Sequence, residues 1–124
     1  MARVRQRDTK PELVTRKLLH AQGYRFRLHQ RSLPGTPDIV LTRHRRIIMV
    51  HGCFWHGHPG CARSRLPETN HDWWAAKIDG NTRRDVETLA RLHELGWRVL
   101  VVWECETKDG DALNRRLTTF MGAT

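Results

Sequence analysis

The sequence predicts an α/β domain in which a central mixed β-sheet is flanked by helices. Residues 38–41 and 47–50 are apolar runs joined by a basic turn, which is typical of a β-hairpin. A long helical pattern then separates residues 47–50 from an apolar run at 97–103, and a strand, a crossover helix and a strand imply a parallel pair. With 124 residues and 39% hydrophobic content, we expect residues 1–124 to form one domain around one core.

The first expected helix runs from Thr9 to about Gln22. Thr9 and Glu12 have the spacing of a capping box, in which the hydroxyl accepts a hydrogen bond from the backbone three residues on. Pro11 falls in the first turn, where its missing N–H costs little, and Gly23 supplies the stop. The residues expected to face the core are Leu13, Leu18 and Ala21.

The next elements are expected to be strands. Residues 24–29 alternate apolar and basic side chains, which predicts a strand with one buried and one positively charged face. A loop over residues 30–37 leads to the hairpin. If residues 43–46 form its turn, Asp38 lies opposite His51, so that the hairpin brings a carboxylate and an imidazole together.

A long helix is expected after Asn70, which can cap it, and before Gly96, with Gly80 as the candidate break point. Its apolar residues at helical spacing are Trp74, Ile78, Val86, Leu89 and Leu92. A last helix over residues 111–120 would pack Leu113, Leu117 and Phe120 against the sheet.

Residues 97–103 are nearly all apolar, which favours a strand buried on both faces. Because this strand would run parallel to residues 47–50, both strands end at the same edge of the sheet. Cys105 would therefore emerge where Cys53 does.

The positive charge is concentrated in the first third of the chain. The formal net charge is +9, and residues 1–46 hold twelve Lys and Arg against three acidic residues, whereas residues 47–124 hold ten of each. Such an imbalance indicates a surface for a polyanion, most commonly nucleic acid; a solvated basic face is the alternative.

The sequence also indicates a cellular compartment. No apolar run reaches the roughly 20 residues of a membrane span, and the N-terminus lacks the apolar region of a secretory signal, so we expect a cytoplasmic protein without membrane association. In that reducing compartment, three cysteines interspersed with histidines favour metal binding over disulfides.

Cys53, His58, Cys61 and Cys105 form a Cys3His set with spacings close to those of structural zinc sites. Four protein ligands leave no position for water, so this Zn²⁺ would be structural and would hold the loop of residues 51–61 in one conformation. The alternative is three free cysteines that act as small hydrophobic residues.

The same loop also carries His51, His56, Phe54 and Trp55. Together with Asp38, the histidines could form a set that hydrolyses phosphodiesters, because a carboxylate and a backbone carbonyl suit Mg²⁺ and a neutral imidazole can activate water. The alternative for His56 is a loop histidine satisfied by its neighbours.

Five segments in order along the chain resemble the very short patch repair (Vsr) endonucleases. They are residues 8–12 (DTKPE), 33–38 (LPGTPD), 50–58 (VHGCFWHGH), 81–85 (NTRRD) and 95–105 (LGWRVLVVWEC). The resemblance implies a restriction-endonuclease-like fold, a structural zinc ion and Mg²⁺-dependent nicking of one DNA strand on the 5′ side of the thymine in a T:G mismatch, which arises from deaminated 5-methylcytosine.

The resemblance also implies a role for particular residues. Asp38 and the main-chain carbonyl of Val50 would bind Mg²⁺, and His56 would be the base or proton relay for the attacking water. Asp85 would orient His56, His51 would assist at the phosphate, and Glu12 would act through water. The residues that would form an aromatic wedge in the base stack are Phe54, Trp55 and Trp74. The alternative for Trp74 is a core residue of the long helix.

This chain departs from related nucleases in two places. Val50 and His51 stand where the wider nuclease superfamily has an acid and a lysine, so only the carbonyl of Val50 could bind a metal. The chain begins at Met1, where the family's N-terminal arm would already contact DNA, and we expect Met1 to contact DNA with weaker binding or relaxed specificity.

The expected partner is double-stranded DNA bound by a monomer, with mismatch-repair proteins as candidate partners. Two other functions stay open: a site-specific nickase or restriction-type nuclease without a mismatch requirement, and a non-catalytic, zinc-containing DNA-binding module.

Overall fold

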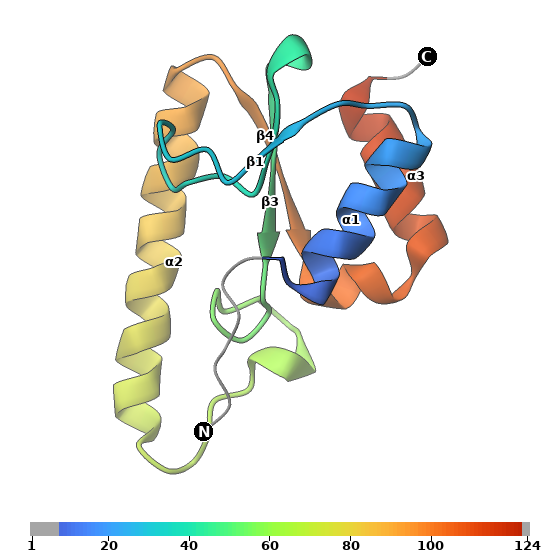
Figure 1. The fold of residues 1–124 in the computed structure, drawn as a ribbon. Helices are drawn as coiled ribbons and strands as arrows, with labels where there is room; N and C mark the ends of the chain where they lie inside the picture. The colour runs from blue at the N-terminus through green and yellow to red at the C-terminus, as the bar shows by residue number, and fades with distance from the viewer. Residues whose placement is uncertain (1–7, 123–124) are drawn as a thin grey trace.

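The computed structural model describes residues 8–122, and within them a four-stranded mixed sheet carries helices on both faces (Figure 1). The strands lie in the order β1-β2-β3-β4; β1, β2 and β3 pair antiparallel, and β3 pairs parallel with β4. The elements are α1 (Lys10–Ala21), β1 (Arg27–Leu28), β2 (Ile39–Leu41), β3 (Arg46–His51), α2 (His71–Glu94), β4 (Arg98–Trp103) and α3 (Gly110–Met121), with short 3-10 helices at Thr42–His44, Ala62–Ser64 and Glu104–Lys108. The predicted α/β fold is confirmed.

Each face of the sheet has its own core, because successive side chains of a strand point to opposite faces. Helix α2 covers one face, and α1 and α3 cover the other (Figure 1). The buried core on the α1 and α3 face comprises Leu19, Ile39, Leu41, Ile48, Val102, Leu113, Leu117 and Met121. The core under α2 comprises Val40, Ile47, Met49, Leu92 and Trp97.

Helix α1 starts as predicted but buries a different face. Thr9 is the N-cap and accepts from the backbone N–H of Glu12, while the Glu12 carboxylate accepts from the backbone N–H of Asp8. Of the predicted inward residues, Leu18 is half-buried and packs against the core as expected, whereas Leu13 is 49% exposed and Ala21 is exposed. The buried residues of α1 are Glu12, Thr15 and Leu19, of which Leu19 belongs to the core.

The hairpin is present, but its predicted register was wrong by two residues. Ile39 pairs with Ile48 because the turn is the 3-10 helix Thr42–His44 followed by Arg45 at φ 56°, so that β3 begins at Arg46. Extending this register places Asp38 beside Met49 rather than His51. A slip of two residues keeps every side chain on its predicted face, so Asp38 and His51 still share one face.

Four further expectations need correction. The strand predicted over residues 24–29 shortens to β1. Helix α2 continues unbroken through Gly80, and Asn70 takes the N-cap position at φ 56° without a side-chain hydrogen bond to the helix. Val86 is 63% exposed and packs in neither core.

The strand β4 lies at an edge of the sheet, and its side chains pack into the cores on both faces, as expected: Leu100 and Val102 on the face of α1 and α3, and Val99 and Val101 on the face of α2. Most of these residues are half-buried rather than fully buried. The parallel pairing of β4 with β3 is confirmed, and His51 pairs with Trp103 at the ends of the two strands. None of the helices in residues 8–122 combines the length and the apolar character needed to cross a membrane.

Candidate active site and metal centre

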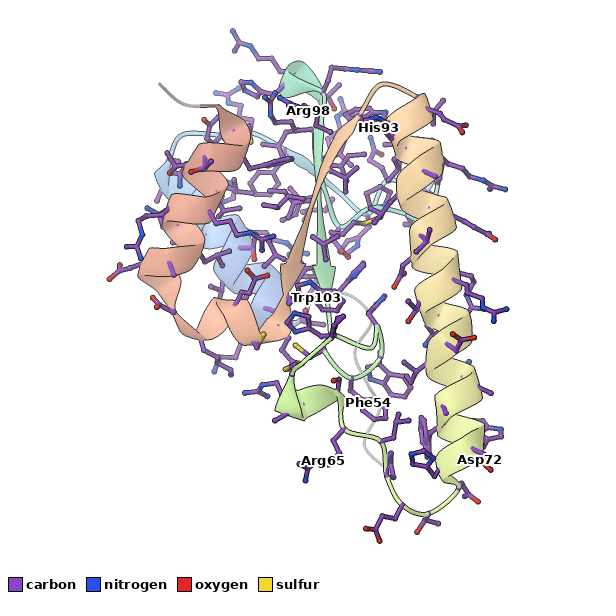
Figure 2. The ribbon with its side chains drawn as sticks, turned by 180° about the vertical axis from the view of Figure 1, so that it is seen from behind. Phe54, Arg65, Asp72, His93, Arg98 and Trp103 are labelled. Atoms are coloured by element: carbon purple, nitrogen blue, oxygen red, sulfur yellow. The ribbon has the colours of Figure 1, made fainter. Side chains whose placement is uncertain are left out.

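A groove of about 1030 Å³ opens at the sheet edge where β3 ends. It is bounded by the start of α1, the chain before β2, the loop after β3 and the middle of α2. Figure 1 shows that the N-terminal half of α2 extends past the sheet beside this loop, and Figure 2 shows Phe54 in the space between them. The groove brings together the candidate catalytic residues Glu12, Asp38, His51, His56 and Asp85.

Next to the groove, Cys53, His58, Cys61 and Cys105 form a Cys/His cluster. Their ligand atoms all lie within 4.8 Å of one another. Cys105 Sγ is 3.5 Å from His58 Nδ1, and the backbone N–H of Cys105 donates to Cys53 Sγ at 3.4 Å. These separations fit a tetrahedral zinc site, in which Zn–S bonds of about 2.3 Å set the sulfurs slightly under 4 Å apart.

The chemistry of these donors also suits a metal. Cys53 is fully buried, and burial raises the pKa of its thiol to about 12. A thiol in such an environment stays protonated unless a cation stabilises its thiolate. Because three thiols and an imidazole lie close enough to share one ion, the donor set fits Zn²⁺, which these four residues would hold.

The loop after β3 is docked on α2 at several points. The Asn81 side chain donates to the backbone carbonyl of Trp55 at 2.9 Å. Gly57 adopts φ +61°, and a Cβ there would lie 2.8 Å from Ile78 Cγ2, so the loop backbone rests directly on the helix. On the strand side, the backbone N–H of Cys53 donates to Glu104. The loop is thus held from both sides.

This docking aligns two histidines with an aspartate of α2. His56 Nδ1 lies 2.6 Å from Asp85 Oδ2, and the rings of His56 and His51 stack with centroids 3.8 Å apart. Burial, and next the charge of His56, lower the pKa of His51 to about 4, so its imidazole is neutral at neutral pH. His51 Nδ1 is buried and has no hydrogen-bond partner among the described residues.

Asp38 lies at the start of β2 and offers one oxygen to the groove. The backbone N–H of Val50 donates to Asp38 Oδ2 at 2.7 Å, whereas Oδ1 is 4.0 Å from His29 Nδ1. Burial raises the pKa of Asp38 to about 7, partly offset by the hydrogen bond from Val50. A half-buried carboxylate whose Oδ1 lies outside the Val50 hydrogen bond fits a hard divalent cation such as Mg²⁺, which would supply positive charge.

Two residues beside the groove were missed in the sequence. His29 is 8% exposed and lies between Glu12 and Asp38, and the Arg16 guanidinium contacts Glu12 and His29. The only signals were the i,i+4 spacing of Glu12 and Arg16 and the end of the alternating run at His29. Neither indicates that these residues meet.

Four rings form an aromatic cluster at the N-terminal end of α2: Phe54, Trp55, Trp73 and Trp74. Trp74 contacts Phe54, Trp55 and Trp73 edge-on at centroid distances of 5.3, 5.8 and 4.9 Å. Trp74 belongs to neither buried core. Trp73, which the sequence did not single out, is 61% exposed. Met1, the other expected DNA contact, lies outside the described residues.

Asp38, His51 and His56 thus meet in one groove at the sheet edge where β3 ends, beside the Cys/His cluster, and a carboxylate with imidazoles suits metal-assisted hydrolysis. Comparison with known proteins defines the class further. The profile of the family described as "DNA mismatch endonuclease Vsr" matches residues 1–63. The chain belongs to this family, and it is a DNA endonuclease.

Individual relatives agree with the family. The chain is 51% identical to the type II nicking enzyme V.XorIIP of Xanthomonas oryzae, over 98% of this chain and 88% of that protein. It is 43% identical to the DNA mismatch endonuclease Vsr of Escherichia coli, over 96% and 76% of the two chains. It is 40% identical to the type II nicking enzyme V.NmeAIP of Neisseria meningitidis, over 94% and 83%.

Proposed function

We propose that this endonuclease nicks one DNA strand on the 5′ side of the thymine in a T:G mismatch, by Mg²⁺-dependent hydrolysis of a phosphodiester. The observation that carries the proposal is the His56–Asp85 contact of 2.6 Å in the same groove as Asp38. It is supported by the 43% identity to a relative named a DNA mismatch endonuclease. Such mismatches arise by deamination of 5-methylcytosine, so the nick would start very short patch repair.

In this proposal, Asp38 and the main-chain carbonyl of Val50 would hold Mg²⁺, and the ion would supply positive charge that stabilises the phosphate in the transition state. Asp38 keeps its orientation through the hydrogen bond from the Val50 N–H. Glu12, which is 2% exposed in the wall of the groove, acts through water rather than as a direct ligand.

His56 accepts the proton of the attacking water. Its Nδ1–H donates to Asp85, which leaves Nε2 as the acceptor and fixes the ring orientation. The stacked and neutral His51 assists at the phosphate and excludes water from one face of His56. The chemistry is hydrolysis, in which water attacks phosphorus and one P–O bond of the backbone breaks.

The aromatic cluster serves as the mismatch sensor. Inserting rings into the base stack costs a few kcal/mol of unstacking, and that cost is lower at a mispair. Cys53, His58, Cys61 and Cys105 would hold a structural Zn²⁺, which would fix the conformation of the loop that carries Phe54, Trp55 and His56. We further propose that residues 1–124 act as one monomeric, cytoplasmic domain on double-stranded DNA, with mismatch-repair proteins as candidate partners.

The test is a nicking assay with two duplexes that differ only in one base pair, T:G in one and T:A in the other, both with Mg²⁺. The proposal expects a single nick on the 5′ side of the mispaired thymine and little cleavage of the T:A duplex. Cleavage of neither duplex, or of both at equal rates, would contradict mismatch-dependent nicking.

A second candidate is site-specific nicking without a mismatch. It is favoured by the printed names of two close relatives, which call them type II nicking enzymes. A nick at one position in a fully paired duplex library, independent of mispairs, would support this candidate over the first.

A further inference from the structure

Four arginines gather at the end of the sheet that is opposite the groove. They lie in the turn that enters β3 and at the start of β4, and we call them the basic end: Arg43, Arg45, Arg46 and Arg98. The groove lies where β3 ends, at His51, which is about 16 Å along the strand from Arg46. Figure 2 shows Arg98 at the opposite end of the molecule from Phe54, which lines the groove.

Two of these guanidinium groups are fixed in place by the fold. Cζ of Arg45 lies 4.4 Å from the centroid of the Trp97 ring, and its Nη2 donates to the carbonyl of Leu95 at 2.7 Å. Arg46 donates through Nε to a backbone carbonyl of α3 at 2.9 Å, and it is the register partner of Arg98 on the neighbouring strand. Cations that are already held in place lose less side-chain freedom when they bind an anion.

The basic end has no acidic counterpart among residues 8–122. None of its four arginines forms an ion pair there, and Glu94, the exposed last residue of α2, pairs with none of them. Arg43 and Arg98 are exposed, and their side chains have no hydrogen-bond partner in the same part of the chain. Positive charges held together without acids repel one another and attract a polyanion.

Helix α2 separates the basic end from the aromatic cluster. The aromatic cluster lies at the N-terminal end of α2, whereas Arg45 bonds to Leu95, which directly follows its last residue. Between Trp74 and the end of α2 the helix rises by about 30 Å, at 1.5 Å per residue. Side chains inserted into a base stack lie between base pairs, so a duplex bound by the aromatic cluster passes the N-terminal end of α2. The basic end then lies on the far side of the molecule from this duplex.

We propose that the basic end binds the phosphates of a second segment of duplex DNA while the groove holds the duplex that is nicked. Arginine suits this role because its planar guanidinium matches the oxygens of a phosphate. Contacts to phosphates carry no sequence information and weaken as salt rises. Such a contact keeps the enzyme on DNA while the groove exchanges one segment for another. The place of the nicked duplex rests on the proposed function, whereas DNA binding by the basic end does not.

The test asks whether one chain holds two duplexes. Two short, fully paired duplexes with different dyes are mixed in excess with the protein, at low salt and without Mg²⁺, and sedimentation velocity is recorded at the wavelength of each dye. The wild type should form a complex of one chain with both duplexes. In Arg43→Ala/Arg98→Ala the second duplex should bind at least about tenfold more weakly. The salt slope of its binding should fall by about 2, because each lost phosphate contact removes about 0.9.

Arg115→Glu is the matched control. It removes two units of positive charge, as the alanine pair does, but from an exposed position on α3. This variant should keep the complex with two duplexes, and Arg43→Lys/Arg98→Lys, which conserves the charge, should stay within a few-fold of the wild type. Equal affinity of the alanine pair and Arg115→Glu for the second duplex would overturn the proposal.

A single substitution covers the case in which the alanine pair is unstable. Arg43→Glu changes the charge by the same amount as Arg115→Glu, and its side chain makes no contact within residues 8–122 whose loss could unfold the chain. Arg43→Glu should also bind the second duplex at least about tenfold more weakly than the control. Equal binding by these two variants would again refute the proposal.

The outcome is separable from that of the proposed function. A wild type that nicks a T:G duplex but never binds a second duplex would overturn this inference alone, and the basic end would then suit an acidic protein surface instead. A wild type that binds two paired duplexes through the basic end, but does not nick at a mismatch, would support this inference and contradict the proposed function.

Discussion

His56 on the loop after β3 and Asp85 on α2 lie 29 positions apart in the chain, yet their side chains meet at 2.6 Å. The contact depends on the docking of the loop on α2 through Gly57 and Asn81. Because His56 Nδ1 faces the Asp85 carboxylate, Nδ1 carries the proton of the neutral ring. The other ring nitrogen, Nε2, is then left as the acceptor on the side of the groove.

Asp85→Asn should slow nicking with little change in DNA affinity. An amide can still contact His56, but it no longer stabilises the imidazolium or selects the tautomer, and general-base catalysis contributes about 10²- to 10⁴-fold. Single-turnover rates measured beside DNA binding separate the two effects. Asp79→Asn, an exposed acidic residue on the same helix, is the control; an Asp85→Asn enzyme as fast as Asp79→Asn would rule out the assigned role.

Replacing Cys105 with Ser should remove zinc and destabilise the loop. The cluster loses a thiolate that arrives from the end of β4, and the free energy of metal binding contributes to folding. Elemental analysis should find one zinc ion per chain in the wild type and none in the variant. The thermal midpoint should fall by more than about 4 °C, the shift expected for roughly 1 kcal/mol in a domain of this size. The exposed His93 gives the control variant His93→Ala; zinc retained in full by Cys105→Ser would contradict the ligand assignment.

Gly57→Ala should destabilise the protein and slow nicking. The new Cβ would lie 2.8 Å from Ile78 Cγ2 at φ +61°, and overpacking of this kind costs about 1–3 kcal/mol. Gly60 gives a matched control, because it has φ +71° but nothing within 4 Å of an added Cβ. Gly60→Ala should lose only the backbone cost of about 1–2 kcal/mol. Denaturant unfolding checks both; equal losses would mean that the loop does not pack closely on α2.

Trp74→Ala should weaken binding to a T:G duplex more than binding to a T:A duplex. Stacking of a base on an aromatic side chain contributes about 1–3 kcal/mol by alanine substitution, or about 5- to 150-fold in affinity. Leu95→Ala, at an exposed apolar residue near the other end of α2, should leave both affinities unchanged. Equal losses on the two duplexes would show that Trp74 does not sense the mispair.

The sequence was most informative where topology alone brings residues together. The parallel pairing of β3 and β4 was enough to predict that Cys105 lies beside Cys53. The other two members of the Cys/His cluster, His58 and Cys61, could be predicted from their short spacing within the loop. Asp38 reached the groove despite a wrong register, because a shift of two residues preserves the face of the sheet.

The sequence was least informative where the contact depends on how helices pack. Leucines suggested the inner face of α1, but that face carries Glu12 and Thr15 beside Leu19, so the meeting of Arg16 with His29 could not be foreseen. Helical spacing likewise did not decide between core and surface for Trp74, because α2 extends past the sheet that would have covered it (Figure 1).

The central claim is that the groove at the end of β3 is the catalytic site, and the nicking rate of Asp38→Asn on a T:G duplex in Mg²⁺ tests it most directly. Loss of the carboxylate charge should reduce the rate to background, while binding of the same duplex, measured without Mg²⁺, stays within a few-fold of the wild type. A variant that binds DNA normally and still nicks at the wild-type rate would place the catalytic site elsewhere.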